Sequence, residues 1–443
     1  HLGPDQPPRA AVDSPRRDPR GDPRPARPPP LTGFVAATAS PLTQFADALS
    51  AKLVSLVAVR AAAAGPVQLR TVESGEVAAS LAKSLNGGPP IAPLPAASVE
   101  RAQVITMLQP TQPVSEADAA AVVVTSGSTG APKGVVLSRA AIRASVEATH
   151  DRLGGVGDWV LALPPHYVAG LMVLARASLA GTRALLARSD LTDLPKVTAQ
   201  LAEPRYISLV PAQLDRGLQR PEVSEALASF SSVLVGGGPI DTALVERAVS
   251  QGIRVVTTYG MSETCGGCVY NGQPLRTVEV ALDDDGRIMI GGPSLFSGYR
   301  LRPDLTAATV VDGRFRTQDR GHWQAGRLLV LGRIDDIVIT GGHKVDLGEV
   351  ERCVQHWAAE RGARAVVLGI PDAIWGTLIV AVSDSTAPLD EVQGAVCESL
   401  PVYAMPRELI SLDPLPWLAS GKPDRIAIRS MITKMLSGRQ APV

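Results

Sequence analysis

Short apolar runs that alternate with helix-like patterns constrain the fold of this chain more than any other feature of its sequence. The runs are Trp159–Leu163, Tyr206–Val210, Ser232–Val235 and Val255–Thr258, and each is followed by a glycine or proline turn and then by helical periodicity. Short buried strands joined by helices are typical of a mainly parallel, doubly wound sheet. We therefore predict an α/β fold with a large N-terminal domain.

The pattern changes between Val278 and Leu331, where turn residues separate alternating apolar ones. The turns are Asp285-Gly286, Asp312-Gly313 and Ala325-Gly326, which predict a subdomain rich in β-hairpins. Further along, the chain mixes strands and helices and predicts a small α+β domain. We expect three parts: a disordered Pro/Arg-rich tail over 1–32, an N-terminal domain over 33–334 with a first helix at Leu42–Ala58, and a C-terminal domain over 335–443.

Composition excludes several classes of function. Lys plus Arg and Asp plus Glu both number 43, so the zero net charge gives no support for a nucleic-acid or anionic-membrane partner. No apolar stretch is long and uninterrupted enough to predict a membrane span or a secretory signal. Four cysteines in 443 residues favour a reducing cytoplasm over a disulfide framework. We predict that Cys265 and Cys268 are packed small residues and not metal ligands.

The strongest single motif runs from Val124 to Gly134, directly after an apolar strand predicted at Ala120–Thr125. Two glycines and several hydroxyl residues precede Lys133 and a third glycine follows it, so backbone N–H groups, hydroxyls and one cation can face phosphate oxygens. A Walker A loop ends in Gly-Lys-Ser/Thr, whereas this loop ends in Pro132-Lys133-Gly134. It is therefore a different triphosphate loop, and we predict the helix Ser138–Leu153 after it.

Together with five later segments, this loop resembles the signature of the adenylate-forming superfamily, which includes acyl- and aryl-CoA ligases. The five segments are Val235–Pro239, Thr258–Thr264, Phe315–Gly321, Leu331–Asp336 and Ser420–Arg425, and they occur in the family's order. The resemblance implies ATP, Mg²⁺ and coenzyme A as cofactors and substrates. It also implies an N-terminal adenylation domain and a mobile C-terminal lid.

The resemblance implies roles for individual residues. Tyr259 is expected to stack on adenine, Glu263 to hold Mg²⁺ and Asp319 to accept from both ribose hydroxyls. Arg333 is expected to clamp ribose or phosphate, and Lys422 to reach the α-phosphate and the acid as a catalytic residue. The other ATP-site residues implied are Thr125, Ser126, Gly127, Ser128, Thr129, Gly130, Lys133, Gly237, Gly238, Pro239, Thr258, Gly260, Met261 and Ser262, with Thr264 beside Glu263 in the catalytic group.

The resemblance also implies two half-reactions. A carboxylate first attacks the α-phosphate and pyrophosphate leaves. The C-terminal domain then turns about Asp335. This turn removes Lys422 from the active site and brings Gly341 and Gly342 to it, where the thiol enters. Free coenzyme A is the expected acceptor.

Two segments, His150–Gly170 and Gly260–Gly272, resemble the o-succinylbenzoate–CoA ligases of menaquinone biosynthesis in actinobacteria. They place His166, Tyr167 and Gly170 in the acid pocket. The family usually has an aromatic residue followed by histidine, whereas this chain has His166 followed by Tyr167. Gln318 also replaces the usual glycine before the ribose aspartate.

A dianionic acid needs a cation for its second carboxylate. Arg176 and Lys344 are the candidates, and the sequence does not choose between them. Two alternatives to an o-succinylbenzoate ligase stay open: another aryl- or acyl-CoA ligase, and a degenerate nucleotide-binding regulatory protein. Intact Lys133, Glu263 and Asp319 argue against the latter. Whether the chain forms a homo-oligomer also stays open.

Overall fold

The computed structural model describes residues 67–116, 118–125, 132–418 and 422–439. All of them belong to the second of the two units into which the chain divides, Ala64–Val443. The predicted tail 1–32 and the predicted helix Leu42–Ala58 therefore lie outside the described residues.

A seven-stranded sheet carries most of the nucleotide motifs. Its order is β13 (Gln273–Pro274), β12 (Gly266–Tyr270), β11 (Val255–Met261), β10 (Ser232–Gly236), β9 (Arg205–Leu209), β7 (Asp158–Leu161) and β8 (Ala184–Leu186). The strands from β11 to β8 are parallel, and β12 and β13 are antiparallel to their neighbours. The four parallel strands predicted from apolar runs are present, with bounds shifted by at most three residues.

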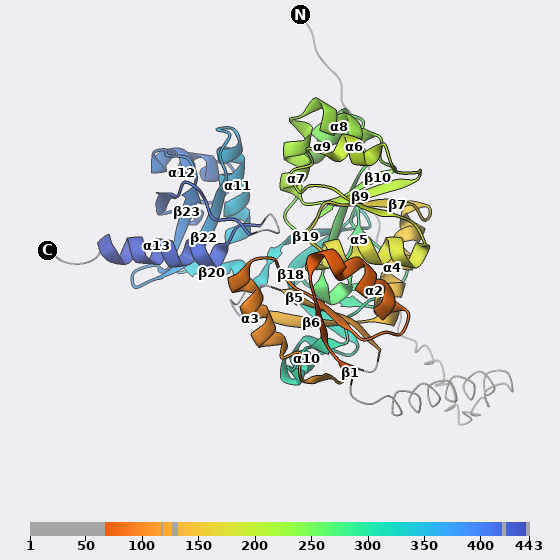
Figure 1. Ribbon diagram of the computed structural model, residues 1–443. Coiled ribbons are helices and arrows are strands. Elements are labelled where there is room, and N and C mark those ends of the chain that lie inside the picture. The colour runs from red at the N-terminus through yellow and green to blue at the C-terminus, as the bar shows by residue number, and fades with distance from the viewer. Residues whose placement is uncertain (1–66, 117, 126–131, 419–421, 440–443) are drawn as a thin grey trace, which may run out of the picture. The chain divides into compact units, whose positions relative to one another are not determined.

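Helices cover both faces of this sheet, as a doubly wound fold requires. Figure 1 shows α6 (Leu194–Thr198), α7 (Pro211–Leu218), α8 (Pro221–Ala228) and α9 (Thr242–Ser250) on one side, with α4 (Arg139–Leu153) and α5 (Val168–Ala180) on the other. Strand alternation explains the division, because Val160 and Ile207 pack in one buried cluster and Trp159 and Tyr206 in another.

A second sheet holds the strand before the predicted phosphate loop. Its order is β16 (Gly298–Tyr299), β6 (Lys133–Ser138), β5 (Ala119–Thr125), β3 (Ile91–Pro93) and β2 (Arg70–Val72), with α2 (Val77–Leu85) and α3 (Ser98–Leu108) nearby in the chain. The sequence interpretation missed β6, which pairs antiparallel with β5 before the helix begins. The predicted helix follows it as α4, with the Ser138 hydroxyl accepting from the Ala141 N–H at 3.0 Å.

The predicted hairpins form a third sheet. It consists of β14 (Glu279–Leu282), β15 (Arg287–Gly291), β18 (Arg314–Gln324) and β17 (Val310–Val311), with β19 (Arg327–Arg333) paired to β18 and α10 (Pro303–Thr309) preceding β17. Asp312 and Gly313 have φ of 49° and 71°, and Ala325 and Gly326 have φ of 49° and 74°. Two consecutive left-handed residues match the twist of a two-residue hairpin, so these turns are confirmed.

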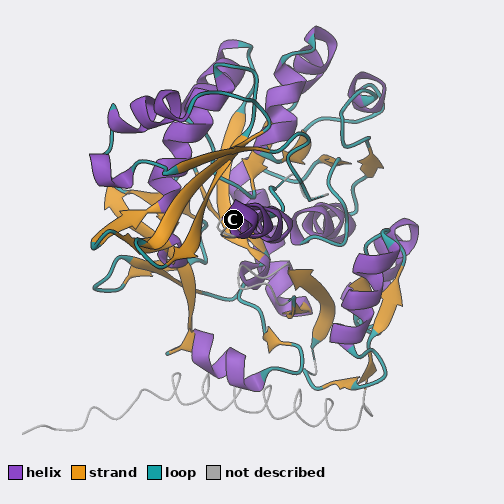
Figure 2. Ribbon diagram, turned by 90° about the vertical axis from the view of Figure 1, so that its left-hand side faces the viewer, coloured by secondary structure: helices purple, strands orange, loops and turns teal. Residues whose placement is uncertain are grey.

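The C-terminal segment builds a sheet of its own. The sheet contains β21 (His343–Asp346), β20 (Ile337–Thr340), β23 (Gly376–Ser383), β22 (Ala365–Asp372) and β24 (Glu408–Ser411), with helices α11 (Leu347–Ala359), α12 (Leu389–Cys397) and α13 (Arg425–Arg439). A short pair, β1 (Val67–Gln68) and β4 (Pro113–Val114), completes the described strands. Figure 2 shows helices and strands interleaved throughout, so the predicted α/β class is confirmed.

The predicted domain boundary coincides with a change of sheet. The hairpin sheet ends with β19 at Arg333, the 3-10 helix η3 (Ile334–Asp336) follows, and β20 starts the next sheet at Ile337. The division into domains at this point stays a prediction. None of the helices in the described residues combines the length and apolarity that a membrane crossing requires.

Candidate active site

The strand before the predicted phosphate loop and the strand after it bring Thr125 and Lys133 together. These two residues are paired across β5 and β6. Ser126, Gly127, Ser128, Thr129 and Gly130 lie outside the described residues. The Lys133 ammonium lies 5.6 Å from the centroid of the Tyr299 ring, within cation–π range. Lys133 and Tyr299 also line a hollow of about 230 Å³.

The structure holds Glu263 in a buried position beside this lysine. Glu263 lies in the 3-10 helix η2 (Ser262–Thr264) and is 9% exposed. The Tyr299 hydroxyl donates to its carboxylate at 2.7 Å. Burial raises the pKa of Glu263, while the Tyr299 hydrogen bond and the Lys133 charge act in the opposite direction. A buried carboxylate with a hard oxygen near a lysine fits the predicted role of Mg²⁺ ligand.

A second carboxylate, Asp319, lies on β18 and contacts the predicted adenine residue. The Tyr259 hydroxyl donates to Asp319 at 2.7 Å. Burial raises the pKa of Asp319, and the Tyr259 bond and the charges of Arg333 and Lys422 lower it. Asp319 and Arg333 are partners in the β18–β19 ladder, and their charged groups lie 3.8 Å apart.

Close packing between strands requires glycine at two positions near the site. A Cβ on Gly236 would lie 2.1 Å from the Thr258 hydroxyl, and one on Gly260 would lie 2.1 Å from the Gly266 carbonyl oxygen. At Gly236 and at Gly260, neighbouring strands therefore approach more closely than a side chain allows. The Thr264 hydroxyl accepts from the Met261 N–H at 3.0 Å and donates to Gly266 at 2.7 Å, so it shapes the turn that presents Glu263.

The next residues of the β10 loop leave room for a ligand. Gly237 has φ of 81°, and a side-chain carbon on Gly238 would meet nothing within 4 Å. Together with Pro239 they end the strand that pairs Gly236 with Thr258. This arrangement leaves open space at the carboxyl ends of parallel strands, where α/β folds bind ligands.

The predicted acid-pocket residues lie at the start of α5. The ring centroids of His166 and Tyr167 are 4.2 Å apart, and Tyr167 occupies the N-cap position of the helix. His166 Nε2 is buried without a hydrogen-bond partner in the described residues, and burial lowers the pKa of its imidazole. A Cβ on Gly170 would lie 2.4 Å from the Pro164 carbonyl oxygen, so Gly170 lets the helix pack against the preceding turn.

The predicted hinge and thiol-side residues are held by local contacts. Asp335 forms an ion pair with Arg333 at 2.7 Å. Gly341 and Gly342 have φ of 54° and 83° in the β20–β21 turn, and the Gly341 N–H donates to the Trp375 carbonyl at 3.0 Å.

Lys422 is solvent-accessible, yet it lies close enough to the ribose-side carboxylate for the charges to interact. Desolvation lowers the pKa of Lys422, the Asp319 carboxylate raises it, and Arg333 lowers it again. The structure thus brings the charges of Lys422, Asp319 and Arg333 close enough to interact. It brings Lys133, Glu263 and Tyr299 together as a second group.

One residue of the site, Tyr299, was not predicted. Tyr299 belongs to the two-residue strand β16, and nothing in its local sequence distinguishes it from a core aromatic.

The pair Cys265 and Cys268 is buried as expected, and burial raises the pKa of Cys268 to about 12, so its thiol stays protonated at neutral pH.

The fold and these two carboxylate groups define a nucleotide-binding α/β protein with the layout of an adenylating enzyme. A family model described as AMP-binding enzyme matches residues 38–300. The chain therefore belongs to the AMP-binding enzyme family.

Individual relatives carry more specific names. A probable 2-succinylbenzoate–CoA ligase of Mycobacterium tuberculosis (strain CDC 1551 / Oshkosh) is 44% identical over 326 residues, covering 70% of this chain and 84% of that protein. The 2-succinylbenzoate–CoA ligase of Enterococcus faecalis is 32% identical over 341 residues, covering 70% and 69%. The O-succinylbenzoate coenzyme A synthetase of Bacillus subtilis, solved with ATP and magnesium, is 28% identical with a TM-score of 0.60, covering 69% of each chain.

Proposed function

We propose that this protein is an ATP-dependent, AMP-forming ligase that converts o-succinylbenzoate to o-succinylbenzoyl-CoA through an acyl-adenylate, in menaquinone biosynthesis. The observation that carries the ligase chemistry is the buried Glu263 beside Tyr299 and Lys133, close to the Asp319–Tyr259 pair. The choice of o-succinylbenzoate as the acid substrate rests on the names of the relatives.

The first half-reaction forms a bond between a carboxylate oxygen and the α-phosphorus and breaks the bond to pyrophosphate. Bound Mg²⁺ neutralises charge on the phosphates, and Glu263 is the residue that would hold it. Lys133 and Lys422 stabilise the negative charge that develops on the phosphate oxygens. Asp319 fixes the nucleoside by accepting from the ribose hydroxyls, with Arg333 beside it.

The second half-reaction transfers the acyl group. The thiol of coenzyme A loses its proton and its sulfur attacks the acyl carbon, which releases AMP. We propose that residues 335–443 act as a lid that turns about Asp335 between the two steps. The change of sheet at η3 and the tight turn at Gly341 and Gly342 support this proposal.

Arg176 is the better of the two candidates for the second carboxylate of the acid. It is 3% exposed on α5, its guanidinium carbon lies 4.8 Å from the Trp159 ring, and no carboxylate pairs with it in the described residues. Burial lowers its pKa, which reflects the cost of an uncompensated buried charge. Lys344, by contrast, is exposed on β21.

The surroundings of Arg176 are short of acceptors. Nε of Arg176, Nε1 of Trp159 and Nε2 of His150 are all buried without a partner in the described residues. Burial, and then the Arg176 charge, lower the pKa of His150 to about 4, so the imidazole is neutral at pH 7. A substrate carboxylate would provide the missing acceptor and the missing negative charge for this cluster.

We predict that Arg176→Met raises the KM for o-succinylbenzoate by about tenfold or more, because a charge-assisted hydrogen bond is lost. The KM for benzoate, which has no second carboxylate, should change little. Initial rates with each acid measure both values.

Lys344→Met is the matched control, since it removes the other candidate cation from an exposed strand. A tenfold effect of Lys344→Met with none from Arg176→Met would reverse the assignment. Arg176→Lys keeps the charge and covers the case in which the Met variant does not fold.

Pyrophosphate release against a panel of acids tests the function itself. We expect o-succinylbenzoate to be used in preference to benzoates and fatty acids. Preference for one of those acids would identify another CoA ligase of this family. Nucleotide binding without acid-dependent pyrophosphate release would favour the regulatory alternative.

We also propose that the protein acts in the cytoplasm, where its nucleotide and coenzyme A substrates are available. The four cysteines are all free thiols, which suits a reducing compartment.

A further inference from the structure

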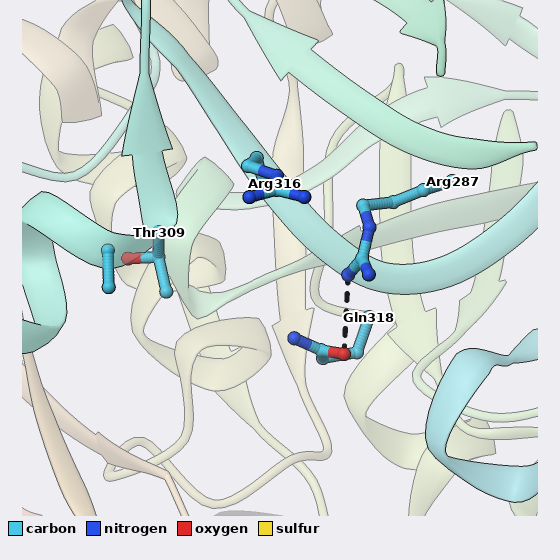
Figure 3. A pocket seen from close by; sticks show the side chains of 5 residues that line it. Arg287, Thr309, Arg316 and Gln318 are labelled. Atoms are coloured by element: carbon cyan, nitrogen blue, oxygen red, sulfur yellow. Dashed lines mark hydrogen bonds between the residues drawn. The ribbon is translucent and has the colours of Figure 1, made fainter. Parts of the chain in front are cut away.

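A small pocket on strand β18 has no role in the proposed reaction. Its volume is about 140 Å³, and its lining consists of Arg287, Ala308, Thr309, Arg316 and Gln318. Figure 3 shows the labelled side chains around a common space, with Arg287 and Gln318 joined by a hydrogen bond.

The alternation of side chains along β18 separates this pocket from the nucleotide residues. Phe315 and Thr317 are buried, whereas Arg316 and Gln318 are exposed on the other face. Asp319 follows the buried residues in this alternation and contacts Tyr259 on that side. The pocket is therefore distinct from the proposed ribose site.

Arg316 differs from the two other arginines of its face. Arg314 pairs with Glu279 at 3.2 Å, and Arg320 pairs with Asp346 at 2.8 Å. Arg316, between them, has no carboxylate partner in the described part of the chain. Its guanidinium group is thus available to bind an anion in the pocket.

Arg287 supplies a second guanidinium, which is fixed in place. Its Nη1 donates to the Thr317 carbonyl at 2.8 Å and to the Gln318 side-chain oxygen at 3.4 Å. Asp283 lies 3.5 Å from its Nε, so Arg287 has a carboxylate partner and Arg316 supplies the uncompensated charge. Because the Gln318 oxygen accepts from Arg287, its amide N–H groups remain as donors for a ligand.

The Thr309 hydroxyl donates to the Leu305 carbonyl at 2.8 Å, so the arginines and the glutamine provide the donors of the pocket. These N–H donors have no matching acceptor in the pocket, and the pocket carries positive charge. Both properties favour binding of an anion. The volume falls well below the roughly 300–1,000 Å³ of pockets for drug-sized ligands, which favours a small one.

We propose that this pocket binds a tetrahedral oxyanion of the phosphate class. Guanidinium groups match the oxygens of phosphate in geometry and charge. The oxyanion is either free inorganic phosphate or a phosphate group of coenzyme A. The first source does not depend on the proposed function, and the second rests on it.

Calorimetric titration of the full chain with inorganic phosphate tests the first source. Saturating Mg²⁺–ATP without acid occupies the nucleotide site, and chloride at equal ionic strength measures non-specific binding. We expect Arg316→Gln to weaken phosphate binding about tenfold, as the loss of one charge-assisted bond should. Arg314→Gln, on the same exposed face, should change it less than about twofold.

Comparing coenzyme A with its analogue lacking the 3′-phosphate, dephospho-coenzyme A, tests the second source. If the pocket holds that phosphate, Arg316→Gln raises the KM for coenzyme A about tenfold and leaves that for dephospho-coenzyme A unchanged. Equal effects of Arg314→Gln and Arg316→Gln in both experiments, or no effect in either, would overturn the proposal. Loss of ligase activity alone would not, since phosphate binding is measured without turnover.

Discussion

Lys422→Ala is expected to slow pyrophosphate release by about 10²–10³-fold, on the scale of removing one donor that stabilises transition-state charge. The same variant, given chemically prepared acyl-adenylate and coenzyme A, should form the thioester at a rate near that of the wild type. The reason is that, in the proposed mechanism, a single cation on the C-terminal segment cannot stay at the α-phosphate once that segment has turned. Quenched-flow measurement of each half-reaction separates the two rates.

The surroundings of Lys422 support its proposed role in the adenylation step. The Asp319 carboxylate raises its pKa and the Arg333 charge lowers it, so Lys422 lies near both groups. Lys434→Ala, which removes another exposed lysine of the C-terminal segment, is the control and should leave both rates unchanged. If Lys422→Ala slows both half-reactions equally, the two-geometry mechanism does not apply to this protein.

Glu263→Gln is expected to lower the rate of pyrophosphate release by about 10²–10³-fold, because a neutral amide is a much weaker ligand for Mg²⁺ than a carboxylate. The amide oxygen can still accept from the Tyr299 hydroxyl, which now bonds the carboxylate at 2.7 Å. Glu263 is 9% exposed and has no ion-pair partner in the described residues, so removing its charge relieves a desolvation cost. The melting temperature should therefore stay equal or rise.

Two variants make the Glu263 result specific. Tyr299→Phe removes only the hydrogen bond and should cost less than about tenfold in rate, while Glu279→Gln removes an exposed carboxylate elsewhere and should cost nothing. Full activity in Glu263→Gln would show that another residue holds the metal. A fall in both melting temperature and activity would show a structural role.

Features set by neighbouring residues could be predicted from the sequence. The hairpins at Asp312-Gly313 and Ala325-Gly326 were identified because both positions of each turn need positive φ, which few residues tolerate. The helix predicted at Ser138–Leu153 after the phosphate loop corresponds to α4 at Arg139–Leu153. Motif residues such as Glu263 and Asp319 were located by family resemblance.

Features set by distant contacts could not be predicted. Tyr299 meets Glu263 across 36 positions of the chain, and a tyrosine in a two-residue strand carries no local signal of that contact. The burial of Arg176 depends on packing against Trp159, which periodicity does not reveal. Strand β6 was missed because its short apolar run directly precedes a strong helix signal.

One measurement tests the central claim most directly. The full chain is incubated with o-succinylbenzoate, ATP, Mg²⁺ and coenzyme A, and the products are identified by mass spectrometry, with each component omitted in turn. We predict o-succinylbenzoyl-CoA and AMP only in the complete mixture, and the acyl-adenylate when coenzyme A alone is omitted. Formation of ADP, or of a thioester from benzoate or a fatty acid but not from o-succinylbenzoate, would contradict the account.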